Sequence, residues 1–261
     1  MHRKEFAKAL QQPVADRRAI PALQRNVLRH ILLNSPNIRD EKFKFFSSTD
    51  LGHVFYTTDE FFFGGNLSRY VESNYSTPIT FRLSKRMTTS GGMTTMSRDY
   101  GAESSETRFE IAVATTPLFE TFSCESESKV GGLRCVSRLE ALQRIVEHEM
   151  VHLVELLLTG DSNCQATPFR RFIKNWFGHR ESNHQLLTPS DIARKELGIR
   201  CGDQVVFRVR GVKHQGVVNR ITKRATVLVE DADGEPYTNG VSYRKFYVPL
   251  TDLRKTVAPR A

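Results

Sequence analysis

The spacing of apolar side chains changes several times along the chain, and each change predicts an element. Residues 1–40 carry an amphipathic helical pattern, and a second helical segment ends where the glycine pair at 64–65 forces a turn. Residues 79–84 then alternate between apolar and polar, which predicts a strand. Two further β-rich runs, at 93–100 and 108–116, lead us to expect a small antiparallel meander.

Helical spacing returns in the second half of the chain. The clearest helix spans 137–158, with leucine, isoleucine and valine at helical intervals and Gly160 as its stop. A second helix spans 168–177 and carries one stripe of large apolar residues. A short third helix begins at Thr188-Pro189, where Thr188 is suited to cap the first turn.

From residue 202 the apolar period becomes two. Four or five short strands separated by turn-forming segments predict a small barrel. The expected fold class is therefore α+β: a helix-rich domain with a small antiparallel meander over 1–188, then a linker helix and an all-β barrel over 189–261.

Composition narrows the class of protein. The apolar fraction of 39% and charged fraction of 26% are ordinary for a globular chain, and no apolar run is long enough to span a membrane. The first residues are basic but lack the apolar core of a signal peptide, so we expect a cytoplasmic protein. The cysteines are too sparse for a disulfide framework and form no CxxC pair, which excludes a zinc ribbon. They are Cys124, Cys135, Cys164 and Cys201.

Positive charge is concentrated at the C-terminal end. The formal net charge is +9, and the segment 189–261 holds fourteen Lys and Arg against eight Asp and Glu, a net charge of about +6. Such asymmetry favours a polyanionic partner, DNA or RNA, although a solvated basic surface without a ligand explains it equally well.

The motif that carries chemistry is EHEMVH in the 137–158 helix. His148 and His152 are one turn apart, so their imidazoles leave the same helix face and can bind one tetrahedral zinc ion. Glu149 projects beside them, where a carboxylate can act as general base towards zinc-activated water. The pattern HExxH is short and also occurs by chance, but polar groups in so apolar a helix would be costly without a purpose.

A catalytic zinc site needs a third protein ligand. The downstream candidates are Cys164, His179 and His184. Cys164 begins the loop that returns the chain to the next helix, which suits a ligand, although a small buried apolar role is the alternative. Glu155 is a carboxylate option with awkward geometry, and it is better placed to support a histidine ligand.

These motifs, in their order, resemble the SprT-like metallopeptidase family, which includes the Spartan-type proteases. FFFGGNL, the predicted strands, HEMVH and the helix that ends in FGH carry the resemblance, which covers residues 28–187. It implies a zincin-like fold, Zn²⁺ as cofactor, a protein or peptide substrate, and cleavage of proteins bound to DNA. The family usually takes its third ligand from a histidine in an HG-x-x-F loop. Here the corresponding stretch is CQATPF, in which Phe169 matches the phenylalanine of that loop. Cys164 lies one residue further from the phenylalanine than the histidine of the family does, and the glycine is missing. The family also has a histidine near the position of His184, with a structural role expected.

The C-terminal segment resembles a KOW-type barrel, on the residues GDQVVFRVRG and the G-x-V turn at 216–218. The resemblance implies contact with RNA, DNA or ribosomal proteins. Arg220, Lys223 and Arg224 supply donors suited to phosphates. The aromatic residues at 243, 246 and 247 can stack on bases or pack the barrel.

Two functions follow from the sequence. The first is an SprT-like zinc peptidase with Glu149 as base and His148, His152 and Cys164 as ligands, held near protein on nucleic acid by the basic barrel. The second is a nucleic-acid- or ribosome-binding protein with a structural zinc site and weak or no peptidase activity. The missing HG signature favours the second function, and the retained Glu149 favours the first.

Overall fold

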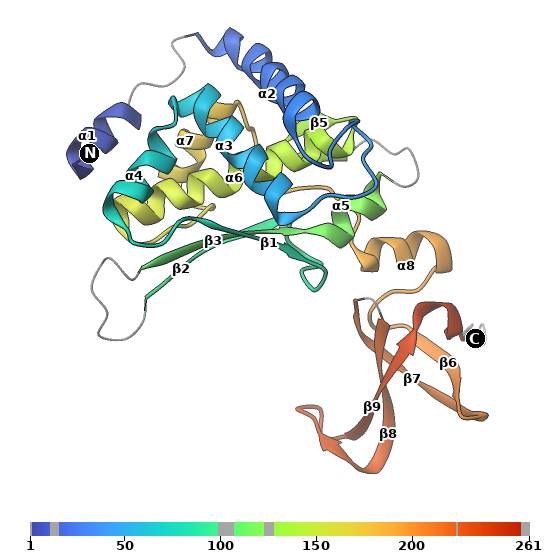
Figure 1. Ribbon diagram of the computed structural model, residues 1–261. Helices are drawn as coiled ribbons and strands as arrows, with labels where there is room; N and C mark the ends of the chain where they lie inside the picture. The colour runs from blue at the N-terminus through green and yellow to red at the C-terminus, as the bar shows by residue number, and fades with distance from the viewer. Residues whose placement is uncertain (1, 11–15, 99–106, 123–127, 223, 257–261) are drawn as a thin grey trace. The chain divides into compact units, whose positions relative to one another are not determined.

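The computed structural model describes residues 2–10, 16–98, 107–122, 128–222 and 224–256 (Figure 1). The chain divides into two compact units, Met1–Leu186 and Leu187–Ala261, each with its own apolar core. The sequence led us to expect a division between residues 188 and 189, two residues further on.

The first unit is built mostly from helices. Its elements are α1 (Arg3–Leu10), the 3-10 helix η1 (Arg17–Ala19), α2 (Ile20–Asn34), α3 (Ser48–Phe63), α4 (Asn66–Asn74), β1 (Thr80–Ser84), β2 (Gly92–Ser97), β3 (Arg108–Ala114), α5 (Thr115–Thr121), β4 (Ser128–Val130), β5 (Leu133–Cys135), α6 (Arg138–Thr159) and α7 (Thr167–Phe177). The helices α6 and α7 and the three strands β1 to β3 were predicted, whereas α4 was not. The short α4 follows the glycine pair directly, so its pattern merges with that of α3.

Helix α6 is the central element of the first unit. It begins where the Ser137 side chain accepts a hydrogen bond from the Glu140 N–H and ends at Gly160, whose φ of 79° lies in the left-handed region. Most of its residues are buried, because helices pack on one side of α6, whereas the strands β2 and β3 pack on another side (Figure 1). A helix covered in this way holds its side chains in fixed positions.

The strands β1 to β3 form a mixed sheet, so the predicted antiparallel meander is wrong. Their order is β1-β3-β2, with β1 parallel to β3 and β2 antiparallel to it. The reason lies in β3, where Phe109 and the run 111–114 are all buried. Such a strand takes the middle of the sheet, while the half-exposed β1 and β2 take the edges.

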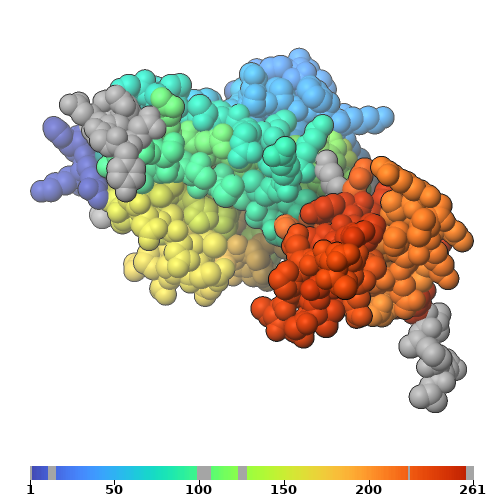
Figure 2. Space-filling model, turned by 90° about the horizontal axis from the view of Figure 1, so that it is seen from below, coloured from blue at the N-terminus to red at the C-terminus, as the bar shows by residue number. Residues whose placement is uncertain are grey.

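The sheet and the end of α6 form one side of the first unit. Seen from below, the teal and green strands and the yellow segment after the middle of α6 lie next to one another (Figure 2). Strand β2 is the one nearest to α6.

The second unit is a helix followed by an antiparallel sheet. Its elements are α8 (Pro189–Leu197), β6 (Gln204–Val209), β7 (Val212–Ile221), β8 (Arg224–Pro236), β9 (Ser242–Pro249), the 3-10 helix η3 (Leu250–Asp252) and β10 (Arg254–Lys255). Helix α8 starts as predicted, with the Thr188 side chain and Asp191 forming a capping box.

The strand order of the second unit is β10-β6-β7-β8-β9. Within the described part of the chain no pairing joins β9 to β10, so the closed barrel that the sequence predicted is not confirmed. Strand β8 also continues to Pro236, through the first part of the expected turn at 231–240, with a change of register between Glu230 and Glu235.

Candidate metal centre

His148 and His152 point to the same place, as their spacing in α6 predicts. Their Nε2 atoms are 3.1 Å apart, and the Phe169 ring of α7 packs against both imidazoles, at centroid distances of 4.9 and 4.6 Å. Phe169 is fully buried, so α7 holds the two histidines from one side. Nitrogens bound to one tetrahedral zinc ion at about 2.05 Å lie about 3.3 Å apart. The two rings are therefore close to the geometry that zinc needs.

Cys164 completes this group. Its thiol sulfur and the ring nitrogens of His148 and His152 all lie within 4.8 Å of one another. Two imidazoles and a thiolate are a donor set that suits zinc. The residues present therefore fit the ion that the sequence led us to expect.

The imidazoles are held in the form that binds a metal. Burial lowers the pKa of His148 to about 3, with a further lowering by the neighbouring histidines, and burial lowers the pKa of His152 to about 4. Both rings are neutral at pH 7, with a nitrogen lone pair that can be donated to a cation.

His179, an alternative third ligand, lies elsewhere. Its ring is buried beneath α6, where Nε2 contacts the Glu147 carboxylate at 2.9 Å. Arg144 and Gln24 bind the same carboxylate, at 2.5 and 3.2 Å. This cluster fastens the segment after α7 to α6, and it occupies His179 in the core.

His184, the other alternative, lines the same cleft but does not join the group. Its backbone pairs with Val130, and its Nδ1 accepts a hydrogen bond from the Leu186 N–H at 3.3 Å. Burial lowers the pKa of His184, and a hydrogen bond with the Thr89 backbone opposes this shift. The backbones of Leu186 and Thr89 therefore both bind this ring, which favours a structural role for His184.

Glu149 also lines the cleft between α6 and β2. Glu149 is 3% exposed, and its Oε2 accepts a hydrogen bond from Thr94 Oγ1 in β2 at 2.8 Å. Burial raises the pKa of Glu149 to about 8, although hydrogen bonds from Thr94 partly oppose this. Gly92 makes room for the side chain, because a Cβ there would stand 2.6 Å from Glu149 Oε1.

Glu155 supports a histidine through an intermediate residue. Ser162 Oγ lies 2.7 Å from His152 Nδ1 and 2.7 Å from Glu155 Oε2. The sequence indicated the supporting role of Glu155 but not Ser162. The sequence did not indicate Ser162, Thr94 or Gly92. Ser162 reaches the motif from the loop after α6, and Thr94 and Gly92 reach it from β2. No local sequence pattern marks such contacts.

His148, Glu149, His152, Cys164 and His184 line a cleft of about 530 Å³. Its lining includes Ile145 and Leu156 of α6, and Gly91, Gly92 and Met93 at and just before the start of β2. The metal-binding group, the buried carboxylate and an edge strand therefore share one cavity.

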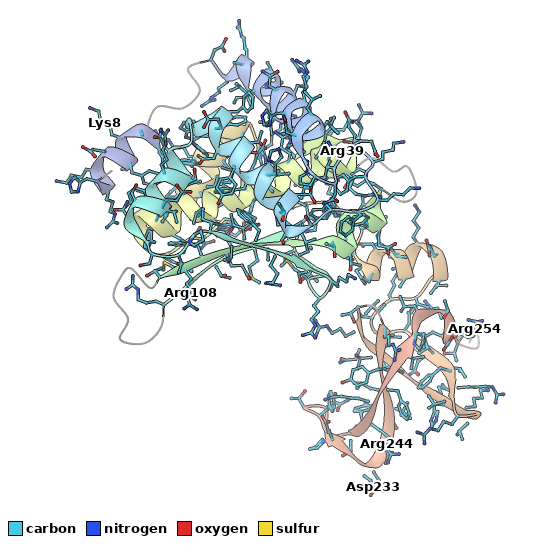
Figure 3. The ribbon with its side chains drawn as sticks, in the orientation of Figure 1. Lys8, Arg39, Arg108, Asp233, Arg244 and Arg254 are labelled. Atoms are coloured by element: carbon cyan, nitrogen blue, oxygen red, sulfur yellow. The ribbon has the colours of Figure 1, made fainter. Side chains whose placement is uncertain are left out.

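The basic residues of the second unit are spread over its surface. Arg220 in β7 and Arg224 in β8 are exposed, and neither makes an ion pair with any described residue; Lys223 lies outside the described residues. Other basic residues of this unit are paired. These pairs are Arg194–Asp191, Arg244–Asp231, Lys245–Glu235 and Lys255–Asp203. Arg244 and Arg254 lie on the two edge strands of the sheet, well apart (Figure 3).

The aromatic residues of β9 divide between packing and exposure. Phe246 packs against Phe207 and His214 at centroid distances of 5.4 and 4.6 Å. Tyr243 contacts Tyr237, whereas Tyr247 is 66% exposed. Only Tyr247 presents a largely free ring to a partner.

Comparison with protein-family models, with curated proteins and with solved structures found no match. Among the described residues, no helix is both long and apolar enough to cross a membrane.

Proposed function

We propose that the first unit is a zinc-dependent peptidase of the SprT-like type, with a zincin-like fold. In this proposal His148, His152 and Cys164 hold the zinc ion, and Glu149 is the general base. The observation that supports it best is the buried Glu149 carboxylate, which shares a cleft with three convergent metal donors. A purely structural zinc site has no use for a carboxylate at this position.

The side chains divide the chemistry among them. Zinc, when bound, acts as a Lewis acid that lowers the pKa of water to about 7 and polarises a carbonyl. Glu149 accepts the proton that the attacking water loses and returns it to the amine that leaves. Thr94 holds this carboxylate in place through its hydroxyl. Burial raises the pKa of Glu149 to about 8 in the chain without metal, so the positive charge of bound zinc would supply the ionised form that accepts the proton. The apolar surroundings then favour the protonated form between the two transfers.

The edge of the sheet favours an extended peptide as substrate. The Gly91 carbonyl accepts a bond from the Ala114 N–H, so Gly91 and, by alternation, Met93 and Thr95 bond to β3. The intervening residues of β2 direct their backbone groups away from β3, at the free edge of the sheet. A substrate strand can add to such an edge through main-chain hydrogen bonds.

In this proposal the second unit brings the peptidase to nucleic acid, which is the role that a KOW-like barrel would have. Arg220 and Arg224 are exposed and without ion pairs among the described residues, so they are free to bind phosphates. Lys223 stands between them in the sequence. Weak binding to DNA or RNA here would raise the local concentration of proteins held on the same strand.

A second function is favoured by one observation. Cys164 stands one residue from the place where the SprT-like family usually has a histidine, and a thiolate makes the zinc ion less Lewis acidic. The alternative is therefore a nucleic-acid- or ribosome-binding protein with a structural zinc site and little or no peptidase activity.

Metal content and cleavage separate these functions. We expect one zinc per purified chain by elemental analysis, lost in Cys164→Ala and kept in His184→Ala. Glu149→Gln should keep the zinc and abolish cleavage of a basic protein bound to single-stranded DNA. Wild-type protein without zinc would overturn both functions. Zinc in the wild type without cleavage would overturn the peptidase. Cleavage that survives Glu149→Gln would overturn Glu149 as its general base.

A further inference from the structure

The contact between Ser162 and its two neighbours fixes where the protons lie. A hydroxyl has one proton to donate, whereas a carboxylate oxygen accepts. Glu155 Oε2 lies 2.7 Å from Ser162 Oγ and also receives the Asn163 N–H at 3.3 Å, so this oxygen acts as an acceptor. The Ser162 proton therefore goes to Glu155.

The tautomer of His152 follows from this. Because the Ser162 proton is already used, Ser162 Oγ can only accept from His152 Nδ1, 2.7 Å away. The ring proton then sits on Nδ1, and Nε2 keeps its lone pair. This is the atom that lies 3.1 Å from His148 Nε2, within the group that includes Cys164.

We infer that Ser162 and Glu155 are positioning residues that hold His152 in the Nδ1–H tautomer for metal binding. The inference rests on the zinc site of the proposed function. Glu155 lies three residues after His152, so both side chains leave neighbouring positions on α6. Gly160 ends the helix and the loop turns back, which brings Ser162 between them.

The same contacts connect two of the ligands. Glu155 binds both Ser162 and the Asn163 N–H, and the next residue is Cys164. The loop that presents the thiol is therefore anchored to the carboxylate that, through Ser162, orients His152. Ser162 is not suited to be a nucleophile, because a nucleophilic serine donates its proton to the histidine, and this one donates to the carboxylate.

Two measurements test whether Glu155 and Ser162 hold His152 in this tautomer. In the metal-free protein, nitrogen NMR at neutral pH should show the Nδ1–H tautomer of His152, and Ser162→Ala should give a mixture of tautomers. In competition with a chelator, Ser162→Ala and Glu155→Ala should each weaken zinc binding by about 10- to 100-fold. Ser162→Thr retains the hydroxyl and should stay close to the wild type.

Thr159→Ala is the matched control. Thr159 Oγ1 bonds to the Glu155 and Asp161 carbonyls, so this variant loosens the same loop without touching His152. It should weaken zinc binding by less than about 3-fold. Equal losses of zinc affinity in Thr159→Ala and Ser162→Ala would overturn the positioning role of Ser162, and so would an unchanged His152 tautomer in Ser162→Ala. A wild type that binds no zinc would instead overturn the proposed function, while the tautomer measurement would still judge the hydrogen bonds.

Discussion

Glu149 and Asp50 are both buried carboxylates, yet their surroundings move their pKa values in opposite directions. Burial tends to raise the pKa in both. Around Asp50, hydrogen bonds from Ser35, Asn37 and Ser47 outweigh burial and hold its pKa well below the ordinary range. Glu149 has only Thr94, so burial dominates. The number of donors therefore separates Asp50, which stays ionised at neutral pH, from Glu149, whose carboxyl can gain and lose a proton near neutral pH.

The Asp50 network should make the first unit sensitive to acid. The pKa of Asp50 is lower in the folded chain than the value of about 3.9 in the unfolded chain. Its contribution is therefore complete above about pH 4 and is lost as the pH falls towards the folded value. Asp50→Asn should lower the free energy of unfolding at pH 7 by about 1–3 kcal/mol and flatten its decline below pH 4. Denaturant unfolding at several pH values, followed by Trp176 fluorescence, measures both. An unchanged acid limb in the variant would contradict this prediction.

Gly92 should matter because of the space it leaves. In Gly92→Ala the new Cβ would displace Glu149, so we expect peptide cleavage to fall by at least about 10-fold with little loss of zinc. Gly91→Ala is a graded control, because its Cβ would meet the His184 and Ile145 side chains at 3.1 and 3.2 Å and leave Glu149 untouched. A larger loss of cleavage in the control than in Gly92→Ala would argue against the steric explanation.

The sequence predicted the candidate site only as far as its signals are local. His148, Glu149 and His152 follow from one turn of helix, and Cys164 from the loop after it. The choice among Cys164, His179 and His184 depended on the path of the loop after α6 and of the segment after α7. Contacts between distant segments decide that question, and periodicity does not record them.

At the scale of elements, α7 is the part that supports the metal-binding group from outside α6. Its stripe of apolar residues was predicted, and Phe169 at one end of the stripe covers both imidazoles. Phe172 belongs to the other part of the helix, where it stacks near Trp176. The helix thus combines a core contact and a site contact along one face.

Removing the Phe169 ring should lower both the stability of the fold and the affinity for zinc. Phe169→Ala should lower the free energy of unfolding by about 3–5 kcal/mol and weaken zinc binding, because the imidazoles lose the surface that restrains them. Phe172→Ala removes a partly buried ring that does not touch the histidines, so it should cost less stability and leave zinc affinity unchanged. Circular dichroism and chelator competition measure the two effects. Equal zinc affinity in both variants would contradict a role for Phe169 at the site.

Helices were easier to predict than sheets for a physical reason. The boundaries of α6, α7 and α8 depend on caps and stops within a few residues. The placement of β3 between β1 and β2 depends on pairing across the chain and on which strand is the most apolar. Neighbouring strands in the sequence were assumed to pair, and β1 and β2 do not.

At the scale of the whole molecule, the two units do not share an apolar core. Every residue proposed to bind zinc belongs to the first unit, as does the single tryptophan, Trp176. The exposed Arg220 and Arg224 belong to the second. The proposed chemistry and the proposed nucleic-acid contact can therefore be tested on separate signals from one chain.

Zinc should stabilise one unit alone. At a free zinc concentration 100 times the dissociation constant, the first unit should gain about 2.7 kcal/mol, because the ion binds only its folded form. Calorimetry of the full chain should show two transitions, of which the one reported by Trp176 moves to higher temperature with zinc. A transition of the second unit that moves equally, or a single transition for the whole chain, would contradict this independence.

The burial of α6 also bears on how relatives of this chain could be found. Few of its positions can be exchanged singly, since most face a neighbour in the core, the cleft or the sheet. The five residues Arg144, Glu147, His148, Glu149 and His152 serve two adjoining clusters within three turns, and Ser162 and Cys164 follow in the next loop. A distant homologue that keeps the same fold and chemistry should keep this spacing as a set. This set is a far more selective sequence pattern than HExxH, and it would stay recognisable after the rest of the chain had diverged.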